Sequence, residues 1–211
     1  MAGLRAKYSR DPARVRQRKL IEATAWCLAQ HGLGGTSVRQ ICAKAGVSAG
    51  LLAHHFSGID ALIARTYEHV GDEVSAVLAA ALAAAPDEPE AKLRAFVDAS
   101  FRPPLLDPDL LAVWLTFWSL VRRDPRIHGI HRDIYAGYRR MLEPLIGGVA
   151  SGGGADVRLA TLAFTAMLDG LWLELCLDPT AFTPAEALAI AHAWVDGLKA
   201  GALTMPETPG R

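Results

Sequence analysis

Tryptophan and acidic residues in the second half of the chain have a spacing that suits cation binding. Trp114 and Trp118 are four residues apart, and Asp169 precedes Trp172 by three, so each pair shares one face of a helix. A quaternary ammonium lacks conventional hydrogen-bond donors and packs against the faces of aromatic rings instead. These pairs therefore favour a site for an organic cation, although Trp pairs at this spacing are also ordinary core residues.

The two acids near Trp172 point in different directions. Asp169 and Glu174 are five residues apart, which separates their side chains by about 140° around a helix. Asp169 shares a face with Trp172, so we expect it to supply the counter-charge and Glu174 to serve a helix or subunit contact. The candidate ligand-binding residues are Trp114, Phe117, Trp118, Tyr135, Tyr138, Asp169 and Trp172.

Other reactive side chains form no catalytic or metal-binding pattern. His54 and His55 are adjacent and point about 100° apart on a helix, and His128 and His131 are an isolated pair. The sequence contains no HExxH motif, no phosphate-binding Gly-rich loop and no nucleophile elbow. We therefore predict no catalytic residue, no metal and no cofactor. A small-molecule-binding helical enzyme is kept only as a distant alternative.

Basic side chains are concentrated at the N-terminus. Residues 1–56 contain nine Lys or Arg and two acids, a charge of +7, and because the whole chain is neutral the remainder carries −7. This asymmetry favours an N-terminal face that meets a polyanion. A protein that only shapes DNA would not need the large apolar remainder of the chain. We therefore expect that remainder to have another role.

The sequence favours a cytoplasmic protein without a membrane segment. Its basic N-terminus leads into no uninterrupted apolar run of the kind found in signal peptides. The most apolar stretch, Leu159–Leu177, carries Asp169 and Glu174, each costing about 2.5–3.5 kcal/mol near a bilayer centre. We expect a buried helix there. The three cysteines are widely spaced, and we expect reduced core residues at Cys27, Cys42 and Cys176.

Apolar periodicity predicts an all-α fold of about nine helices. No sustained alternation typical of strands occurs. Pro or a capping residue opens most segments, and Gly or Pro closes them. The expected helices are Pro12–Gln30 with Asp11 as N-cap, Ser37 to Gly46, Ser48 to Phe56, Asp60–Ala84, Pro89–Phe101, Pro108–Val121, Pro125–Ile146, Asp156–Leu177 and Pro184–Lys199.

The second and third expected helices form a helix-turn-helix pattern. Gly46 suits the turn between them because glycine tolerates a positive φ. Ile41 and Val47 are expected to hold the pair together, with Leu51 or Leu52 beneath the second member. Together with the basic charge of residues 1–56, this pattern favours a DNA-binding module over a plain helical hairpin.

These segments resemble a known family. "TSVRQICAKAGVSAGLLAHHFSGIDAL" (residues 36–62) and the preceding "RKLIEATAWCLAQHGLGG" are similar to the DNA-binding segment and first helix of the TetR family of repressors. The resemblance implies an N-terminal DNA-binding domain at 1–58 and a helical ligand-binding and dimerisation domain at 59–203. It also implies a homodimer on a palindromic double-stranded operator. Residues 204–211 are expected to be a disordered tail.

The capped helix pair and the basic charge of residues 1–56 also predict which residues contact DNA, with a recognition helix at Ser48–Phe56. Two positions depart from the family pattern: Ala53 stands where an aromatic is usual, and Ile59 where a Lys usually contacts phosphate. Basic residues of the first helix are expected to compensate. The expected DNA contacts are Arg14, Arg16, Arg18, Lys19, Ser37, Arg39, Ser48, Ala49, Leu51, His54 and His55.

Two Trp-rich segments resemble a subgroup of this family. "WLTFW" (residues 114–118) and "DGLWLE" (residues 169–174) look like the corresponding pieces of BetI-like repressors, which control choline-to-glycine-betaine genes. This resemblance implies that choline or a related quaternary ammonium compound is the effector. The alternative is a TetR-type regulator of an unrelated apolar or aromatic ligand, with the Trp residues as a plain apolar wall.

Overall fold

The computed structural model describes residues 13–150 and 156–202, which form nine α-helices and contain no strand. The predicted all-α fold is therefore confirmed. The helices are α1 (Ala13–Gly35), α2 (Val38–Ala45), α3 (Ala49–His55), α4 (Ile59–Ala84), α5 (Pro89–Ser100), α6 (Pro108–Val121), α7 (Pro125–Val149), α8 (Val157–Leu177) and α9 (Pro184–Lys199). The predicted cap at Asp11, the helix start at Pro12 and the tail at 204–211 lie outside the described residues.

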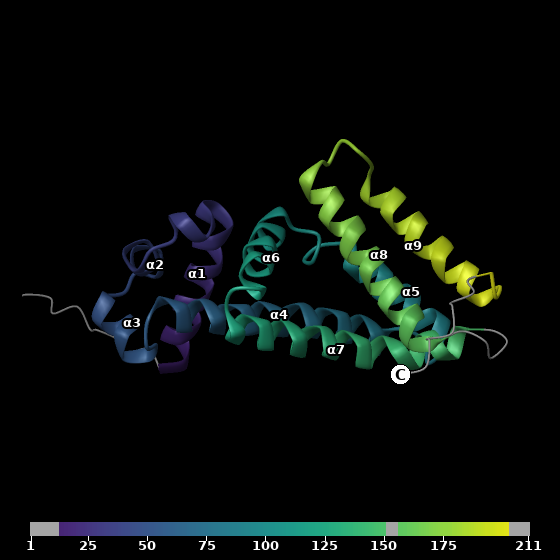
Figure 1. Cartoon of the computed structure of the whole chain (residues 1–211), viewed down its shortest axis with the longest axis horizontal. Coiled ribbons are helices and arrows are strands. Elements are labelled where there is room, and N and C mark those ends of the chain that lie inside the picture. Colours follow the sequence, from purple (N-terminus) through teal and green to yellow (C-terminus); the bar gives the residue numbers. More distant parts are fainter. Residues whose placement is uncertain (1–12, 151–155, 203–211) are drawn as a thin grey trace, which may run out of the picture.

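Helices α1, α2 and α3 gather at one end of the molecule (Figure 1). Gly46 ends α2 in the left-handed conformation with φ 66°, and its N–H donates to the Ala43 carbonyl. Ser48 then opens α3, its hydroxyl oxygen accepting from the Leu51 N–H at 3.3 Å. Ile41 and Leu52 are buried and hold the pair against α1. The predicted helix-turn-helix geometry is present.

Helix α4 connects this end to the rest of the chain and lies alongside α7 (Figure 1). Leu62 belongs to the core beneath α1–α3, Tyr67 to a middle cluster, and Leu78 to the core formed mainly by α5, α7, α8 and α9. The middle cluster also contains Leu28 of α1 and Trp114 of α6. One helix therefore contributes to every apolar cluster of the described chain.

Helix α8 is long and apolar enough to cross a membrane by length and composition alone, and it is the one such helix among the described residues. It packs on α6, α7 and α9 and buries Phe164, Leu168 and Leu175. Other apolar side chains stay open to solvent, with Leu162 38% and Leu177 62% exposed. The helix is thus only partly covered by its own chain.

Candidate functional site

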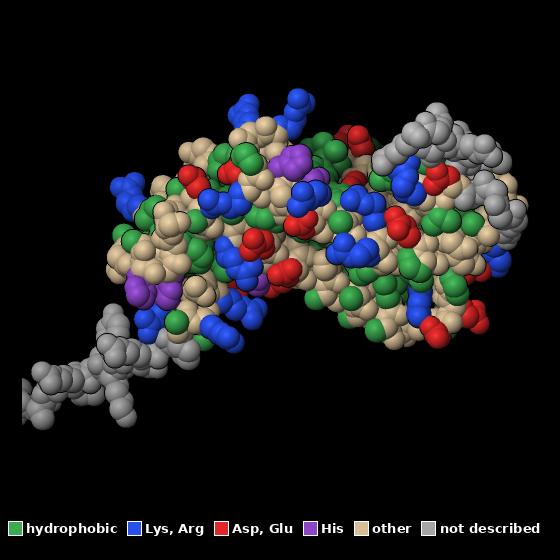
Figure 2. All heavy atoms as spheres, turned by 60° about the horizontal axis from the view of Figure 1, so that its bottom comes forward, with side chains coloured by type: hydrophobic (Ala, Val, Ile, Leu, Met, Phe, Trp, Pro, Cys, Tyr) green, Lys and Arg blue, Asp and Glu red, His purple; other side chains and the backbone are tan. Residues whose placement is uncertain are grey.

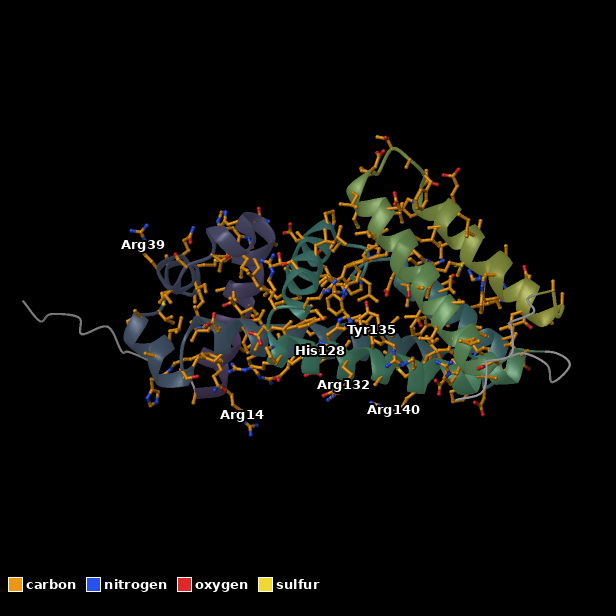
Figure 3. All side chains as sticks on the ribbon, in the orientation of Figure 1. Arg14, Arg39, His128, Arg132, Tyr135 and Arg140 are labelled. Carbon is orange, nitrogen blue, oxygen red and sulfur yellow. The ribbon has the colours of Figure 1, made fainter. Side chains whose placement is uncertain are left out.

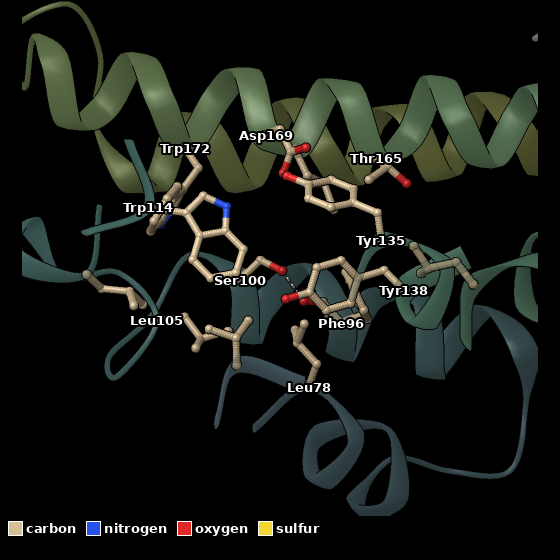
Figure 4. Close-up of a pocket in the computed structure, with 14 residues that line it drawn as sticks. Leu78, Phe96, Ser100, Leu105, Trp114, Tyr135, Tyr138, Thr165, Asp169 and Trp172 are labelled. Carbon is tan, nitrogen blue, oxygen red and sulfur yellow. Dashed lines mark hydrogen bonds between the residues drawn. The ribbon is translucent and has the colours of Figure 1, made fainter. Parts of the chain in front are cut away.

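A small cavity of about 90 Å³ lies between α4, α5, α6, α7 and α8 (Figure 4). Helices far apart in the sequence each supply part of its wall, and the α5–α6 connection adds Leu105. Its lining combines aromatic rings, leucines, hydroxyl groups and one carboxylate. The lining residues are Val74, Leu78, Phe96, Ser100, Leu105, Leu110, Trp114, Tyr135, Tyr138, Leu142, Thr165, Leu168, Asp169 and Trp172.

Two of the seven residues proposed from the sequence do not line this cavity, and these are Phe117 and Trp118. Phe117 is fully buried and stacks on Tyr67, with ring centroids 4.3 Å apart. Trp118 packs half-buried against the same middle cluster. Trp114, one helical turn earlier, reaches the cavity. The other predicted residues that line the cavity are Tyr135, Tyr138, Asp169 and Trp172.

The sequence did not predict that α5 forms part of the cavity wall. Phe96 and Ser100 are four residues apart on one face of α5, and both line the cavity. Amphipathic periodicity marks this face as inward-pointing, but it does not show which inward residues meet a cavity. Thr165 of α8 was missed for the same reason.

Asp169 carries the charge of the cavity. Burial raises the pKa of this carboxyl to about 6, and the interaction with the Tyr135 hydroxyl partly opposes that rise. Burial also raises the pKa of Tyr135, and the nearby Asp169 charge adds to this. No Lys, Arg or His is among the described lining residues. Glu174, the other acid considered from the sequence, is exposed, so Asp169 is the acid that faces the cavity.

An aromatic contact connects the cavity wall to α4. The Trp114 ring lies edge-on to Tyr67, with centroids 5.5 Å apart, and Tyr67 hydrogen-bonds through its hydroxyl to His131 Nδ1 at 2.9 Å. Burial lowers the pKa of His131, which favours the neutral ring in this contact. Across residues 13–150 and 156–202, no group of three or more His, Cys, Asp or Glu could hold a metal ion.

The second helix of the helix-turn-helix presents small and polar side chains to solvent. Ser48, Ala49 and His54 are exposed, whereas Leu51 and His55 are half-buried. The two His rings lie edge to face with centroids 5.1 Å apart. Of this adjacent pair, His54 is therefore the one placed to reach a partner outside the chain.

The other helices of this module, α1 and α2, carry the basic residues. Arg14 and Arg39 are exposed and project from opposite sides of the α1–α3 module (Figure 3). Arg16 is half-buried, and Lys19 is exposed. Arg18 pairs with Glu22 at 2.7 Å, so part of its charge is already neutralised.

Positive charge is not confined to that module. Figure 2 shows Lys and Arg side chains over the middle of the molecule as well as at its α1–α3 end. Arg132 and Arg140 of α7 point away from the cavity (Figure 3). The net negative charge of the C-terminal part is therefore an average over mixed surfaces rather than a uniform field.

Comparison with known proteins assigns both parts of the fold. Residues 20–66 match the bacterial regulatory proteins of the tetR family, and residues 89–200 match the C-terminal domain of BetI-type transcriptional repressors. The chain belongs to the TetR family. Its particular type is that of the BetI-type transcriptional repressors, as the Trp-rich segments predicted.

Curated relatives carry the same description. BetI regulators of Burkholderia thailandensis and Paraburkholderia phymatum are each 32% identical to this chain, covering 88% of it and 94% of their own length. These names describe transcriptional regulators rather than enzymes. Regulators of this family bind operator DNA and small-molecule effectors.

Solved structures share the fold. A putative regulator from Pseudomonas aeruginosa PAO1 is 45% identical, with a TM-score of 0.85 over 95% of this chain and 98% of that one. A Saccharomonospora viridis regulator in complex with choline is 19% identical, with a TM-score of 0.76 over 88% and 97% of the two chains. FadR of Bacillus subtilis in complex with stearoyl-CoA is also 19% identical, with a TM-score of 0.71 over 87% and 98%.

Proposed function

We propose that this repressor binds a palindromic operator as a homodimer in the cytoplasm and responds to choline or a related quaternary ammonium compound. One observation carries the ligand assignment: the rings of Trp114, Tyr135 and Trp172 line the same cavity as Asp169, whose carboxylate has no cationic partner in the described lining. An organic cation would supply the missing positive charge and would pack against the ring faces.

The cavity volume supports a small effector. At about 90 Å³ it is well below the roughly 300–1,000 Å³ of pockets for drug-sized ligands. A long acyl chain, such as that of the stearoyl-CoA bound to the Bacillus subtilis FadR, would require a much larger space. A compact neutral or aromatic ligand remains the alternative, because leucines and Phe96 form much of the wall.

Calorimetry with a matched pair of ligands tests the assignment. Choline and 3,3-dimethylbutan-1-ol have nearly the same shape, but only choline is charged. We expect choline to bind and the neutral alcohol to bind much more weakly. Trp172→Ala should weaken choline binding at least tenfold, near the upper end of about 0.5–2 kcal/mol for one ring. Trp118→Ala removes a Trp outside the cavity and serves as the control.

Two outcomes would contradict the cation site. Equal binding of choline and the neutral alcohol would show that the Trp residues form only an apolar wall. Equal losses from Trp172→Ala and Trp118→Ala would show that choline binds elsewhere. The assignment to the TetR family does not depend on either result.

For DNA binding we propose the α1–α3 module, residues 13–58 of the described chain, with the α3 side chains in the major groove. Ser48, Ala49 and Leu51 favour methyl contacts and shape readout, with His54 as the polar contact. Arg39→Ala should lower operator affinity and reduce the slope of log affinity against log salt by about one. Arg132→Ala, which removes an exposed Arg of α7, should leave that slope unchanged. Equal slopes for both variants and the wild type would contradict the proposed surface.

For the dimer we propose that α8 and α9 pack against a second copy. Their apolar side chains Leu162, Leu177 and Ile190 are 38%, 62% and 47% exposed in the single chain. A helix that is apolar on most sides needs partners on more than one side. Two-fold symmetry would place the recognition helices about 34–36 Å apart, one turn of DNA, or somewhat farther in a relaxed state.

A further inference from the structure

Tyr138 holds a buried hydroxyl group with no hydrogen-bond partner. It lies three residues after Tyr135 on α7, lines the cavity and is only 7% exposed. Its hydroxyl forms no hydrogen bond within the described chain. Burial raises the pKa of Tyr138, and an interaction with Ser75 of α4 opposes this rise without reaching hydrogen-bond geometry. Burying an unpaired hydroxyl costs free energy, so its position requires an explanation.

The other hydroxyl groups of the cavity already have partners. Ser100 donates through Oγ to the Phe96 carbonyl at 2.8 Å, and Thr165 donates through Oγ1 to the Thr161 carbonyl at 2.8 Å. The Tyr135 hydroxyl interacts with the Asp169 carboxylate. Tyr138 is therefore the hydroxyl of the described lining that forms no hydrogen bond.

The two tyrosines mark different parts of the cavity. Their rings lie edge to face, with centroids 5.6 Å apart. In Figure 4 the hydroxyl end of Tyr135 lies beside Asp169, whereas Tyr138 lies toward Ser100 and Phe96. A ligand whose cationic group sits at Asp169 would thus place its other end near Tyr138.

We propose that the Tyr138 hydroxyl hydrogen-bonds to an alcohol group of the effector, so that the cavity selects amino alcohols among small quaternary ammonium compounds. This inference rests on the proposed function and adds a second recognition point to it. Tyr138 stays protonated because burial disfavours its anion. An alcohol suits this neutral partner, whereas a ligand carboxylate would be repelled by Asp169 with no cationic side chain in the described lining to compensate.

Calorimetry with two cations and two Tyr→Phe variants tests this inference on the full chain. The cations are choline and propyltrimethylammonium, in which a methyl group replaces the alcohol. Tyr138→Phe should reduce the preference for choline over propyltrimethylammonium by roughly 3- to 10-fold, the effect of losing one hydrogen bond. Tyr135→Phe is the matched control: it removes the hydroxyl beside Asp169 and should weaken both cations by the same factor.

Thermal melting of the ligand-free variants separates recognition from packing. Tyr138→Phe should melt at or above the wild-type temperature, because no hydrogen bond of the free protein is lost. An unchanged preference ratio in Tyr138→Phe, or an equal loss for both cations, would overturn the inference and leave the cation site intact. If neither cation binds the wild type, the proposed function fails, and the inference fails with it.

Discussion

Asp169 lies in surroundings that disfavour its own charge. Burial raises its pKa from 3.8 to about 6, so the folded protein holds the proton more tightly than the unfolded chain does. Below about pH 4 the group is protonated in both states and costs nothing. The penalty develops as the pH rises through about 4 to 6, and it reaches the order of 3 kcal/mol at neutral pH as an upper bound.

Asp169→Asn should therefore stabilise the ligand-free repressor in a pH-dependent way. We expect its free energy of unfolding to exceed that of the wild type by about 1–3 kcal/mol at pH 7.5, with the excess falling to about a third of that value at pH 4.5. Urea unfolding across this range measures the difference. Glu174→Gln, which changes an exposed acid, should show little pH dependence. A constant Asp169→Asn difference at all pH values would show that the carboxylate is not held out of water.

Much of the cavity could be predicted residue by residue, and the rest depends on tertiary packing. Asp169 and Trp172 share a face at helical spacing, and both line the cavity. The same spacing joined Trp118 to Trp114, yet Trp118 packs outside the cavity. Residue spacing shows which side chains share one face of a helix. The position along that face at which a cavity opens between neighbouring helices is determined by tertiary packing. Phe96 was missed because nothing local distinguishes it from other core residues.

At the scale of elements, α8 has an open face. A Cβ atom added at Gly170 would meet no heavy atom within 4 Å, so a side chain at this position fits within the single chain. Gly170→Arg should therefore leave the protomer folded but place a charge in the proposed α8–α9 interface. We expect light scattering at micromolar concentration to give the mass of a monomer, with a cooperative melting transition retained.

The matched control for this variant lies on α7. Gly129 also has no heavy atom within 4 Å of an added Cβ and is half-buried. Gly129→Arg should keep the wild-type mass. A dimer that persists in Gly170→Arg would show that α8 does not form the interface, and a wild-type monomer would refute the dimer itself.

Helix bounds followed from the sequence where caps and Pro coincide. Asp107 with Pro108, and Thr183 with Pro184, open α6 and α9 at the predicted residues. Helix α7 was expected to end at Ile146 but continues to Val149. Of the two glycines that suggested a stop, Gly148 instead allows close packing, because Pro89 of α5 lies 2.6 Å from the position of an added Cβ there. That contact between distant segments is not visible in the local sequence.

At the scale of the whole molecule, the cavity and the DNA-binding module share structural elements. Helix α4 contributes to all three apolar clusters, and Gln30 of α1 donates to Asp109 of α6 at 3.0 Å. A ligand shifts such a system only if it prefers one arrangement of these parts. Shared packing supports coupling but does not measure it.

The coupling can be measured in either direction. We expect choline to change operator affinity by a factor within the usual range of about 5–150, and operator DNA to change choline affinity by the same factor. Fluorescence anisotropy with labelled operator gives the first value, and calorimetry on the free and operator-saturated protein gives the second. A factor of one in both measurements would show that choline binds without operating a switch. Trp114→Phe should alter the factor more than Trp172→Phe, because Trp114 is a buried member of the middle cluster in ring contact with Tyr67 of α4, whereas Trp172 is only half-buried against that cluster.

The double placement of Trp114 has a consequence for anyone who wishes to build biosensors from this scaffold. It lines the cavity and also packs in the cluster that contains Leu28 of the DNA-binding module. Substitutions at this position for a new analyte would alter DNA binding together with ligand binding. Libraries screened for ligand binding alone would therefore yield sensors with poor dynamic range. Thr165 on α8 is a better position to diversify, since it lines the cavity and its hydroxyl hydrogen-bonds within its own helix, to the Thr161 carbonyl.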